Sequence, residues 1–399
     1  MKLFLKLTYP VLVLLLFFSS AHAQQKDDPE AKVPAYTLPE ILKTTNGKTV
    51  NSVADWENTR RPEILSLFET EVYGKLPKEF DKITYTVTND VPGAMDGKAH
   101  LKQVDIKVWR ANRSVTIHLI LFTPNNHKGP APAFVLINNR GESNTDPTRK
   151  KKSEFWPAEM AIDSGYAIAA FNNSDVAPDN KDTYKNGLLK LYPELASAPD
   201  GMKAISAWAW GASRVMDYFK TDKDIDFNKV GVVGHSRGGK TALWVGALDK
   251  RFAMVFASCS GNTGASIARR RFGEKISDIN RVFPHWFDDN YKKYSDDEAA
   301  LPVDQHMLLA LIAPRPLYTT NATKDLWADP KGSYLSVQLA QQVYDMYGKH
   351  SALPPVAPPP NTPIIKSAQG YHIREGVHNL TAYDWGNFIK FANYHYYNK

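Results

Sequence analysis

The sequence predicts an α/β fold with a mostly parallel central sheet. Five short, nearly continuous apolar runs occur between residues 132 and 322, and helical segments separate most of them. Strands that are buried on both faces and alternate with helices are typical of a parallel sheet. The chain has 399 residues, of which 43% are apolar and 23% are charged, so it is long enough for one large α/β domain or two small ones.

The segments that precede this pattern predict a helix followed by antiparallel strands. Residues 60–74 carry apolar side chains at helical spacing. Apolar and polar residues alternate in the next three segments, as expected for antiparallel strands with one solvated face. These segments are "ITYTVTNDV", "AHLKQVDIKVW" and "SVTIHLILFTP".

The parallel part of the sheet is predicted from the five apolar runs. They are "PAFVLIN" (132–138), "YAIAAFN" (166–172), "KVGVVGH" (229–235), "FAMVFASC" (252–259) and "PRPLYTTNA" (314–322). Helices are expected at 153–164, 201–219 and 237–248. A proline-rich loop at 352–363 precedes a last strand and a C-terminal helix at 383–395.

A serine lies where one of these strands meets the next helix. Gly234-His235-Ser236-Arg237-Gly238 matches G-x-S-x-G, with the strand VGVV before it and the helix KTALWVGAL after it. In an α/β-hydrolase fold this turn exposes the serine Oγ at the carboxyl edge of the sheet, beside helix N–H groups that can stabilise an oxyanion. The context predicts that Ser236 is a nucleophile, although a serine in a structural turn would give the same five residues.

A serine nucleophile needs a base and an acid, which follow it in the chain order Ser, acid, His in this fold. His378 lies in a loop between the last strand run and the final helix, where the base is expected. Asp325 follows Asn321, where the preceding strand should end. Asp329 precedes Pro330 and is typical of a helix N-cap, so we assign Asp325 to orient His378 and Asp329 to begin a helix.

These motifs together resemble one family. The segments are "GHSRGGKTALWVGALDKRFA", "RRFGE", "FPHWF", "KDLWADPKG" and "GVHNLTAYDW". They resemble the bacterial glucuronoyl esterases of carbohydrate esterase family 15, and the similarity covers roughly residues 55–398. The resemblance implies a carboxylic ester hydrolase of the 4-O-methyl-glucuronoyl methylesterase type. Its implied substrates are esters between (4-O-methyl-)glucuronic acid on xylan and lignin alcohols, with glucuronoxylan or a lignin-carbohydrate ester as the partner.

The resemblance also implies roles for residues around the serine. Arg237 helps to hold the oxyanion, Lys240 and Glu274 contact sugar hydroxyls, and Trp327 packs near the sugar. Each residue has an ordinary structural alternative: a solvated lysine, a charge on a helix face, or a core tryptophan. For Trp286, in "FPHWF", core and site are equal alternatives.

The sequence departs from the family pattern at one position. Many members carry the acid after the strand that follows the serine helix, and Cys259 stands there in this chain. A thiol cannot hold a negative charge beside an imidazolium at neutral pH unless its pKa is strongly lowered. We therefore expect Asp325 to be indispensable.

Two other functions fit the same sequence features. An acetyl xylan esterase or another carbohydrate deacetylase on this fold would use the same three residues without needing a sugar site on the acyl side. A polysaccharide-binding protein on an esterase fold is a second alternative, which the intact Ser236, His378 and Asp325 argue against.

The N-terminus predicts export. Residues 1–23 combine Lys2 and Lys6 with an apolar core and small residues at Ala21 and Ala23, which is typical of a signal peptide cleaved after Ala23. The apolar run is too short for a membrane anchor. We expect a periplasmic or secreted protein without membrane contact after cleavage, with an arm at 24–54 and a single catalytic domain at 55–399.

Composition limits the partners and cofactors. The formal charge of +7 is scattered, and nucleic-acid binding is therefore not expected. Cys259 is the only cysteine, so the chain has no intrachain disulfide and no cysteine-based metal cluster. We expect no metal site, no organic cofactor and a monomer.

Overall fold

The computed structural model describes residues 29–397 and contains two units. The described part of the smaller unit, which ends at Ala35, contains the short 3-10 helix Pro29–Lys32. The larger unit begins at Tyr36 and contains the sheet. The predicted signal peptide lies outside the described residues. Within 29–397, no helix is both long enough and apolar enough to cross a membrane.

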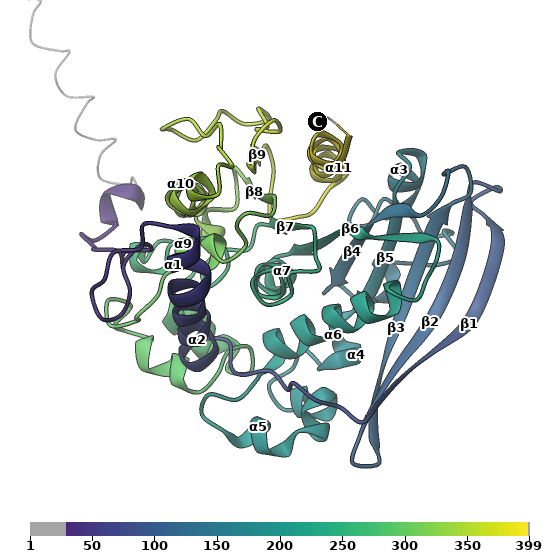
Figure 1. The fold of residues 1–399 in the computed structure, drawn as a ribbon, viewed down its shortest axis with the longest axis horizontal. Helices are drawn as coiled ribbons and strands as arrows, with labels where there is room; N and C mark the ends of the chain where they lie inside the picture. The colour runs from purple at the N-terminus through teal and green to yellow at the C-terminus, as the bar shows by residue number, and fades with distance from the viewer. Residues whose placement is uncertain (1–28, 398–399) are drawn as a thin grey trace, which may run out of the picture. The chain divides into compact units, whose positions relative to one another are not determined.

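Within the described residues, nine strands form one mixed sheet in the order β1-β2-β3-β5-β4-β6-β7-β8-β9 (Figure 1). The pairs from β1 to β3 and the pair β3–β5 are antiparallel, and all other pairs are parallel. The strands are β1 Lys82–Ala94, β2 Ala99–Arg110, β3 Arg113–Pro124, β4 Ala131–Asn138, β5 Ala167–Asn172, β6 Ile225–His235, β7 Met254–Ser258, β8 Leu317–Ala322 and β9 Gln369–Arg374. The predicted mostly parallel sheet with antiparallel N-terminal strands is confirmed.

Helices cover both faces of this sheet (Figure 1). Apolar residues of α2, α6, α7, α9 and α10 share one buried cluster, whereas those of α3 and α11 belong to a second cluster. The helices are α1 Val53–Asp55, α2 Arg61–Glu71, α3 Ala158–Asp163, α4 Asn173–Val176, α5 Pro193–Ser197, α6 Ala204–Phe219, α7 Arg237–Leu248, α8 Ile276–Val282, α9 Gln305–Ala310, α10 Pro330–Met346 and α11 Ala382–Tyr397.

The local sequence explains where these elements begin and which faces they bury. Every residue of β4 and β7 is buried, as expected for continuous apolar runs in the middle of a parallel sheet. Helix α10 begins where predicted: the Asp329 side chain accepts a hydrogen bond from Gly332 N, and Pro330 is the first helical residue. In the segment 24–54, Ile41 and Val50 are buried in the core of the larger unit.

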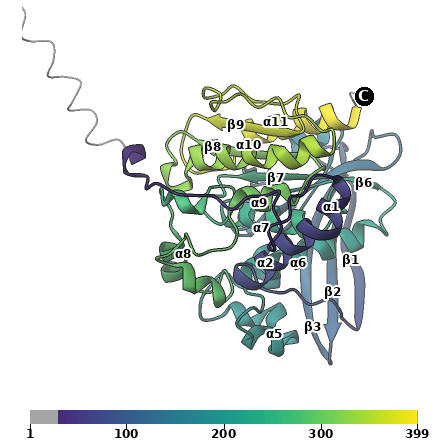
Figure 2. The ribbon, with the colours of Figure 1, turned by 60° about the vertical axis from the view of Figure 1, so that its left-hand side comes forward.

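The parallel strands bring three later segments to one edge of the sheet. The carboxyl ends of β6, β8 and β9 lead into the loops that carry Ser236, Asp325 and His378. Strands β8 and β9 pair in parallel, and helix α10 lies beside them (Figure 2). Residues far apart in the chain therefore meet at this edge, which is where open α/β sheets bind ligands.

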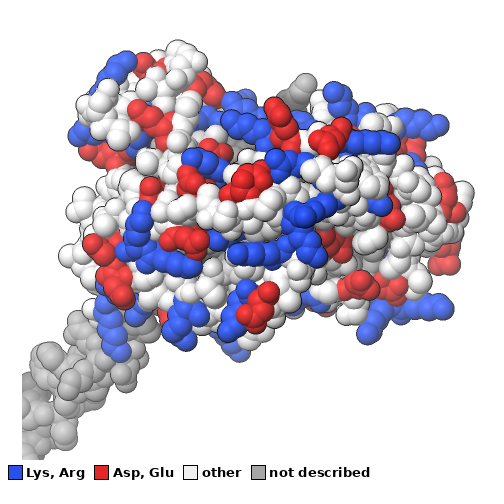
Figure 3. Space-filling view, turned by 90° about the horizontal axis from the view of Figure 1, so that it is seen from below, with Lys and Arg blue, Asp and Glu red and all other residues white. Residues whose placement is uncertain are grey.

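Charged side chains of both signs share the surface. On the face in Figure 3, Lys and Arg side chains are interspersed with Asp and Glu side chains. Elsewhere on the described surface as well, opposite charges form ion pairs, such as Lys75 with Asp200 at 2.5 Å and Lys250 with Glu57 at 2.8 Å. The face is therefore mixed in charge, unlike the single-sign surface that steers a polyanion.

Candidate active site

Ser236 occupies a strained turn between β6 and α7. Its φ of 57° and ψ of −125° lie outside the regions that side-chain-bearing residues normally adopt. The turn depends on Gly234, because a Cβ there would lie 1.9 Å from the carbonyl oxygen of Gly238. The sharp turn places Ser236 immediately before the first turn of α7, where backbone N–H groups have no partner within the helix.

The predicted base and acid lie together at the neighbouring strand ends. His378 Nδ1 is 2.6 Å from Asp325 Oδ2, and the Asp325 side chain is 4% exposed, whereas that of His378 is 39% exposed. Asp329 is occupied elsewhere, because it caps α10 and its Oδ2 lies 2.9 Å from Arg270 Nε. Asp325 is thus the carboxylate that contacts His378.

A cavity of about 300 Å³ opens in front of these residues. Every site residue predicted from the sequence lines this cavity: Ser236, His378, Asp325, Arg237, Lys240, Glu274, Trp327 and Trp286. The two tryptophans differ in exposure. Trp286 is 2% exposed and stacks on Phe283, with ring centroids 3.7 Å apart, whereas Trp327 is 55% exposed. Trp286 therefore belongs to both the core and the cavity wall.

Lys240 and Glu274 form a buried ion pair in the cavity wall. Lys240 Nζ lies 2.6 Å from Glu274 Oε2, and the two side chains are only 3% and 10% exposed. The same Nζ donates to the carbonyl oxygen of Asn262. Burial lowers the pKa of Lys240, and the Glu274 carboxylate offsets part of this shift. Both side chains line the cavity, so Lys240 is neither solvated nor unpaired and Glu274 is not an exposed charge.

Asp179, which the sequence analysis did not identify, fixes the Arg237 side chain. Asp179 Oδ2 lies 2.5 Å from Arg237 Nη1. Its Oδ1 lies 3.0 Å from His285 Nε2 and accepts a 2.8 Å hydrogen bond from Trp286 Nε1. Burial alone would raise the pKa of Asp179, but these hydrogen bonds and the Arg237 charge lower it. Asp179 is therefore an anionic anchor. Its place after the strand 166–172 was the available sequence signal.

Cys259 lies against the predicted base and acid. Cys259 Sγ, one carboxylate oxygen of Asp325 and one ring nitrogen of His378 all lie within 4.8 Å of one another. Burial raises the pKa of the Cys259 thiol, and the Asp325 charge adds to this effect. The thiol is therefore neutral at pH 7. Among the described residues, this trio is the group whose geometry could hold a metal ion.

His235 and Arg140, which were also absent from the predicted site, pack against the His378 loop. The His235 and His378 rings have centroids 4.5 Å apart. Burial holds the pKa of His235 well below its usual value, and the His378 and Arg140 charges contribute. Arg140 Nη1 donates to Asn379 Oδ1 at 2.5 Å, and its Nη2 lies 3.2 Å from His235 Nε2. His235 is therefore a neutral neighbour of the site.

Comparisons with known proteins identify the family of this chain. The family model described as glucuronyl esterase of fungi matches residues 106–348. A carbohydrate esterase from an unknown prokaryotic organism is 40% identical over 92% of this chain and 91% of its own length. A 4-O-methyl-glucuronoyl methylesterase from Schizophyllum commune is 28% identical over 86% of this chain and 82% of its own.

The fold has close relatives among solved structures. A glucuronoyl esterase from Solibacter usitatus superposes with a TM-score of 0.86 and is 37% identical, covering 92% of this chain and 100% of its own. Most of this chain therefore has a counterpart in that structure.

Proposed function

Since this chain belongs to the glucuronoyl esterases of carbohydrate esterase family 15, we propose that it hydrolyses esters of glucuronic or 4-O-methyl-glucuronic acid. The observation that carries this proposal is a cavity lined by two kinds of residues. Ser236 and His378 support ester cleavage, and the Lys240–Glu274 pair supports recognition of a sugar on the acyl side.

The reaction follows the serine hydrolase sequence. His378, oriented by Asp325, takes the proton of Ser236 as the Oγ attacks the C6 carbonyl of the uronate. The tetrahedral intermediate collapses when the C6–O bond to the alcohol breaks, and His378 returns the proton to the leaving alkoxide. A water molecule, deprotonated by His378, then attacks the acyl-enzyme. The C6–Oγ bond breaks as His378 returns this proton to Oγ, which frees glucuronate and regenerates Ser236.

The oxyanion is stabilised at the start of α7. The N–H groups of its first turn face the carboxyl edge, and the positive end of the helix dipole favours negative charge there. The Arg237 guanidinium adds N–H donors and a positive charge that the Asp179 carboxylate partly offsets, and Asp179 fixes its orientation. Arg237 Cζ lies 4.7 Å from the centroid of the Trp286 ring, and this contact restricts the motion of the guanidinium further. This charge also favours the uronate group, which becomes a carboxylate in the product.

The acyl-side sugar is bound by polar and aromatic groups. Lys240 donates to one hydroxyl of the ring and Glu274 accepts from another. Trp327 packs on the ring from the rim, and Trp286 forms the inner wall. A cavity of about 300 Å³ is at the lower end of small-molecule pockets, so it suits one sugar residue with the polymer outside.

The proposal also includes the polymer substrate, the location of the enzyme and its oligomeric state. The substrate is a glucuronate ester of glucuronoxylan, including lignin-carbohydrate esters, and the enzyme acts after export with its leader removed after Ala23. The reaction as written uses only protein side chains, backbone N–H groups and water. A monomer suffices, because every proposed site residue belongs to one chain.

The test compares kcat/KM for a benzyl ester of glucuronic acid and for 4-nitrophenyl acetate, with Ser236→Ala as the blank. A strong preference for the glucuronate ester, abolished in the variant, is the expected result. A preference for acetate would overturn the proposed substrate while leaving the serine mechanism, and acetylated xylan would be the next substrate. A serine-hydrolase probe that fails to label Ser236 would overturn catalysis itself and favour a polysaccharide-binding protein.

A further inference from the structure

The loop that carries His378 is an irregular segment between β9 and α11. Its tip is exposed: Val377 is 61% exposed. The backbone bond from Lys324 N to Gly376 O, at 2.9 Å, fixes only the beginning of the loop. An imidazole that transfers protons must be held within about 0.5 Å of its productive position. The groups that fix the rest of the loop therefore affect the position of the imidazole and, through it, the reaction rate.

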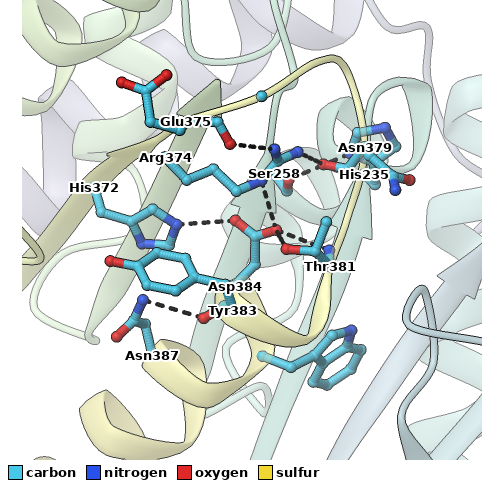
Figure 4. A network of polar contacts seen from close by, with 12 residues as sticks. His235, Ser258, His372, Arg374, Glu375, Asn379, Thr381, Tyr383, Asp384 and Asn387 are labelled. Carbon is cyan, nitrogen blue, oxygen red and sulfur yellow. Dashed lines mark hydrogen bonds and ion pairs between the residues drawn. The ribbon is translucent and has the colours of Figure 1, made fainter. Parts of the chain in front are cut away.

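Arg374, the last residue of β9, reaches along this loop (Figure 4). Its Nη2 donates to the carbonyl oxygens of Val377 at 2.9 Å and Asn379 at 2.6 Å, the residues on either side of His378. Its Nη1 donates to Glu375 O at 3.2 Å. One guanidinium therefore holds three carbonyl groups of the loop, and its planar set of five donors suits this task.

Asp384, in the first turn of α11, holds both Arg374 and the end of the loop (Figure 4). Its Oδ2 accepts from Arg374 Nε at 3.0 Å and from the N and Oγ1 of Thr381, each at 2.8 Å. Its Oδ1 lies 2.9 Å from His372 Nε2. Burial alone would raise the pKa of Asp384, but the His372 hydrogen bond and the Arg374 charge lower it, and the carboxylate is ionised at neutral pH.

We propose that Arg374 and Asp384 are positioning residues for catalysis, which hold the peptide groups on both sides of His378 and so align its imidazole with Ser236 and Asp325. The inference rests on the proposed function only in assuming that His378 transfers protons. Neither residue lines the cavity, and they act through the loop rather than on the substrate. Misplacement of a catalytic group by about 1 Å can cost on the order of 100-fold in rate.

The test is Arg374→Lys, with Arg315→Lys as the matched control. Arg315 also donates from a partly buried guanidinium to three backbone carbonyls, those of Gly246, Asp249 and Phe252, but it precedes β8 at the opposite end of that strand from Asp325. A lysine keeps the charge in each variant and loses the planar set of donors. Both substitutions therefore remove guanidinium hydrogen bonds to backbone carbonyls, beside His378 in one variant and at the far end of β8 in the other, and Arg374→Lys also removes the bond from Nε to Asp384.

Arg374→Lys is expected to lower kcat about 10- to 100-fold for both the glucuronate ester and 4-nitrophenyl acetate, with KM within about twofold. The rate of Ser236 labelling by a serine-hydrolase probe should fall in parallel. Arg315→Lys should shift the unfolding temperature by a similar amount and leave kcat within about twofold. Because acetate hydrolysis and probe labelling do not depend on a sugar site, failure of the proposed substrate would not affect this test.

A folded Arg374→Lys with unchanged kcat would overturn the proposal, because the contacts would then serve stability alone. Equal losses of kcat in the two lysine variants would also overturn it. If Arg374→Lys does not fold, Thr381→Val decides the question, because it removes one hydroxyl donor to Asp384 and keeps the shape. We expect Thr381→Val to lower kcat at least about threefold with KM unchanged, and an unchanged kcat would refute the positioning role.

Discussion

Replacing Lys240 with methionine separates substrate recognition from catalysis. Methionine keeps most of the length of the side chain and removes its charge. In the proposed complex Lys240 gives a charged hydrogen bond to a sugar hydroxyl, which contributes about 1.5–3 kcal/mol. Since about 1.4 kcal/mol corresponds to a tenfold change, kcat/KM for the glucuronate ester should fall about 10- to 150-fold. Hydrolysis of 4-nitrophenyl acetate, which has no sugar on its acyl side, should change less than about threefold.

The same substitution has a calculable effect on stability. Lys240 Nζ lies 2.6 Å from Glu274 Oε2 and both side chains are almost fully buried, so Lys240→Met leaves an unpaired carboxylate inside the protein. Breaking a buried pair in this way costs about 3–5 kcal/mol of unfolding free energy. The double variant Lys240→Met/Glu274→Gln removes both charges and should recover most of that loss without recovering the glucuronate activity.

The assay is steady-state kinetics on both esters, together with denaturant unfolding of the parent protein, the single variant and the double variant. The double variant is the control. If it is as stable as the parent protein but still hydrolyses the glucuronate ester poorly relative to acetate, the loss of activity is due to substrate recognition and not to instability. Equal losses on the two esters would refute the reasoning. Lys240 would then be a structural lysine, and the sugar would be recognised elsewhere.

Three other outcomes follow from the structure. Asp325→Asn should lower kcat about 10³- to 10⁴-fold on either ester with a small change in KM, because the amide cannot stabilise the imidazolium; residual activity within tenfold of the parent would contradict this. Gly234→Ala should prevent Ser236 labelling by a serine-hydrolase probe, because the added methyl would lie 1.9 Å from Gly238 O; normal labelling would be incompatible with the turn described. Burial raises the pKa of Asp288 to about 8, with smaller contributions from Glu71 and Asp200. The folded state therefore binds this proton more tightly than the unfolded state, and the contribution to stability is lost as the pH rises from about 4 to about 8. Asp288→Asn should flatten that decline in denaturant midpoints measured between pH 5 and pH 9, and an unchanged slope would contradict the assignment.

The parts of the fold that were predictable are those that local sequence determines. Continuous apolar runs predict buried parallel strands, and glycines around Ser236 predict a tight turn. His378 and Asp325 could be placed because each follows a predicted strand, and parallel strands end at the same edge. These arguments need only the order of elements along the chain.

The contacts that were missed depend on pairing across the fold. Asp179 lies 58 residues before its partner Arg237, and no spacing rule connects them. Arg374 and Asp384 are close in sequence, yet their hydrogen bonds to the His378 loop depend on the path of that loop between β9 and α11. Trp286 could not be assigned because it packs in the core on one side and borders the cavity on the other.

The position of Cys259 has an evolutionary consequence. Strands β7 and β8 are neighbours in register, with Ser258 opposite Thr320, so the residues that follow them approach the same imidazole. A carboxylate that arose at position 259 could contact His378 before Asp325 was lost. A lineage could thus move its acid from one strand to the next by single substitutions, with an active protein at each stage. The neutral thiol occupies this second position without competing for the imidazole proton.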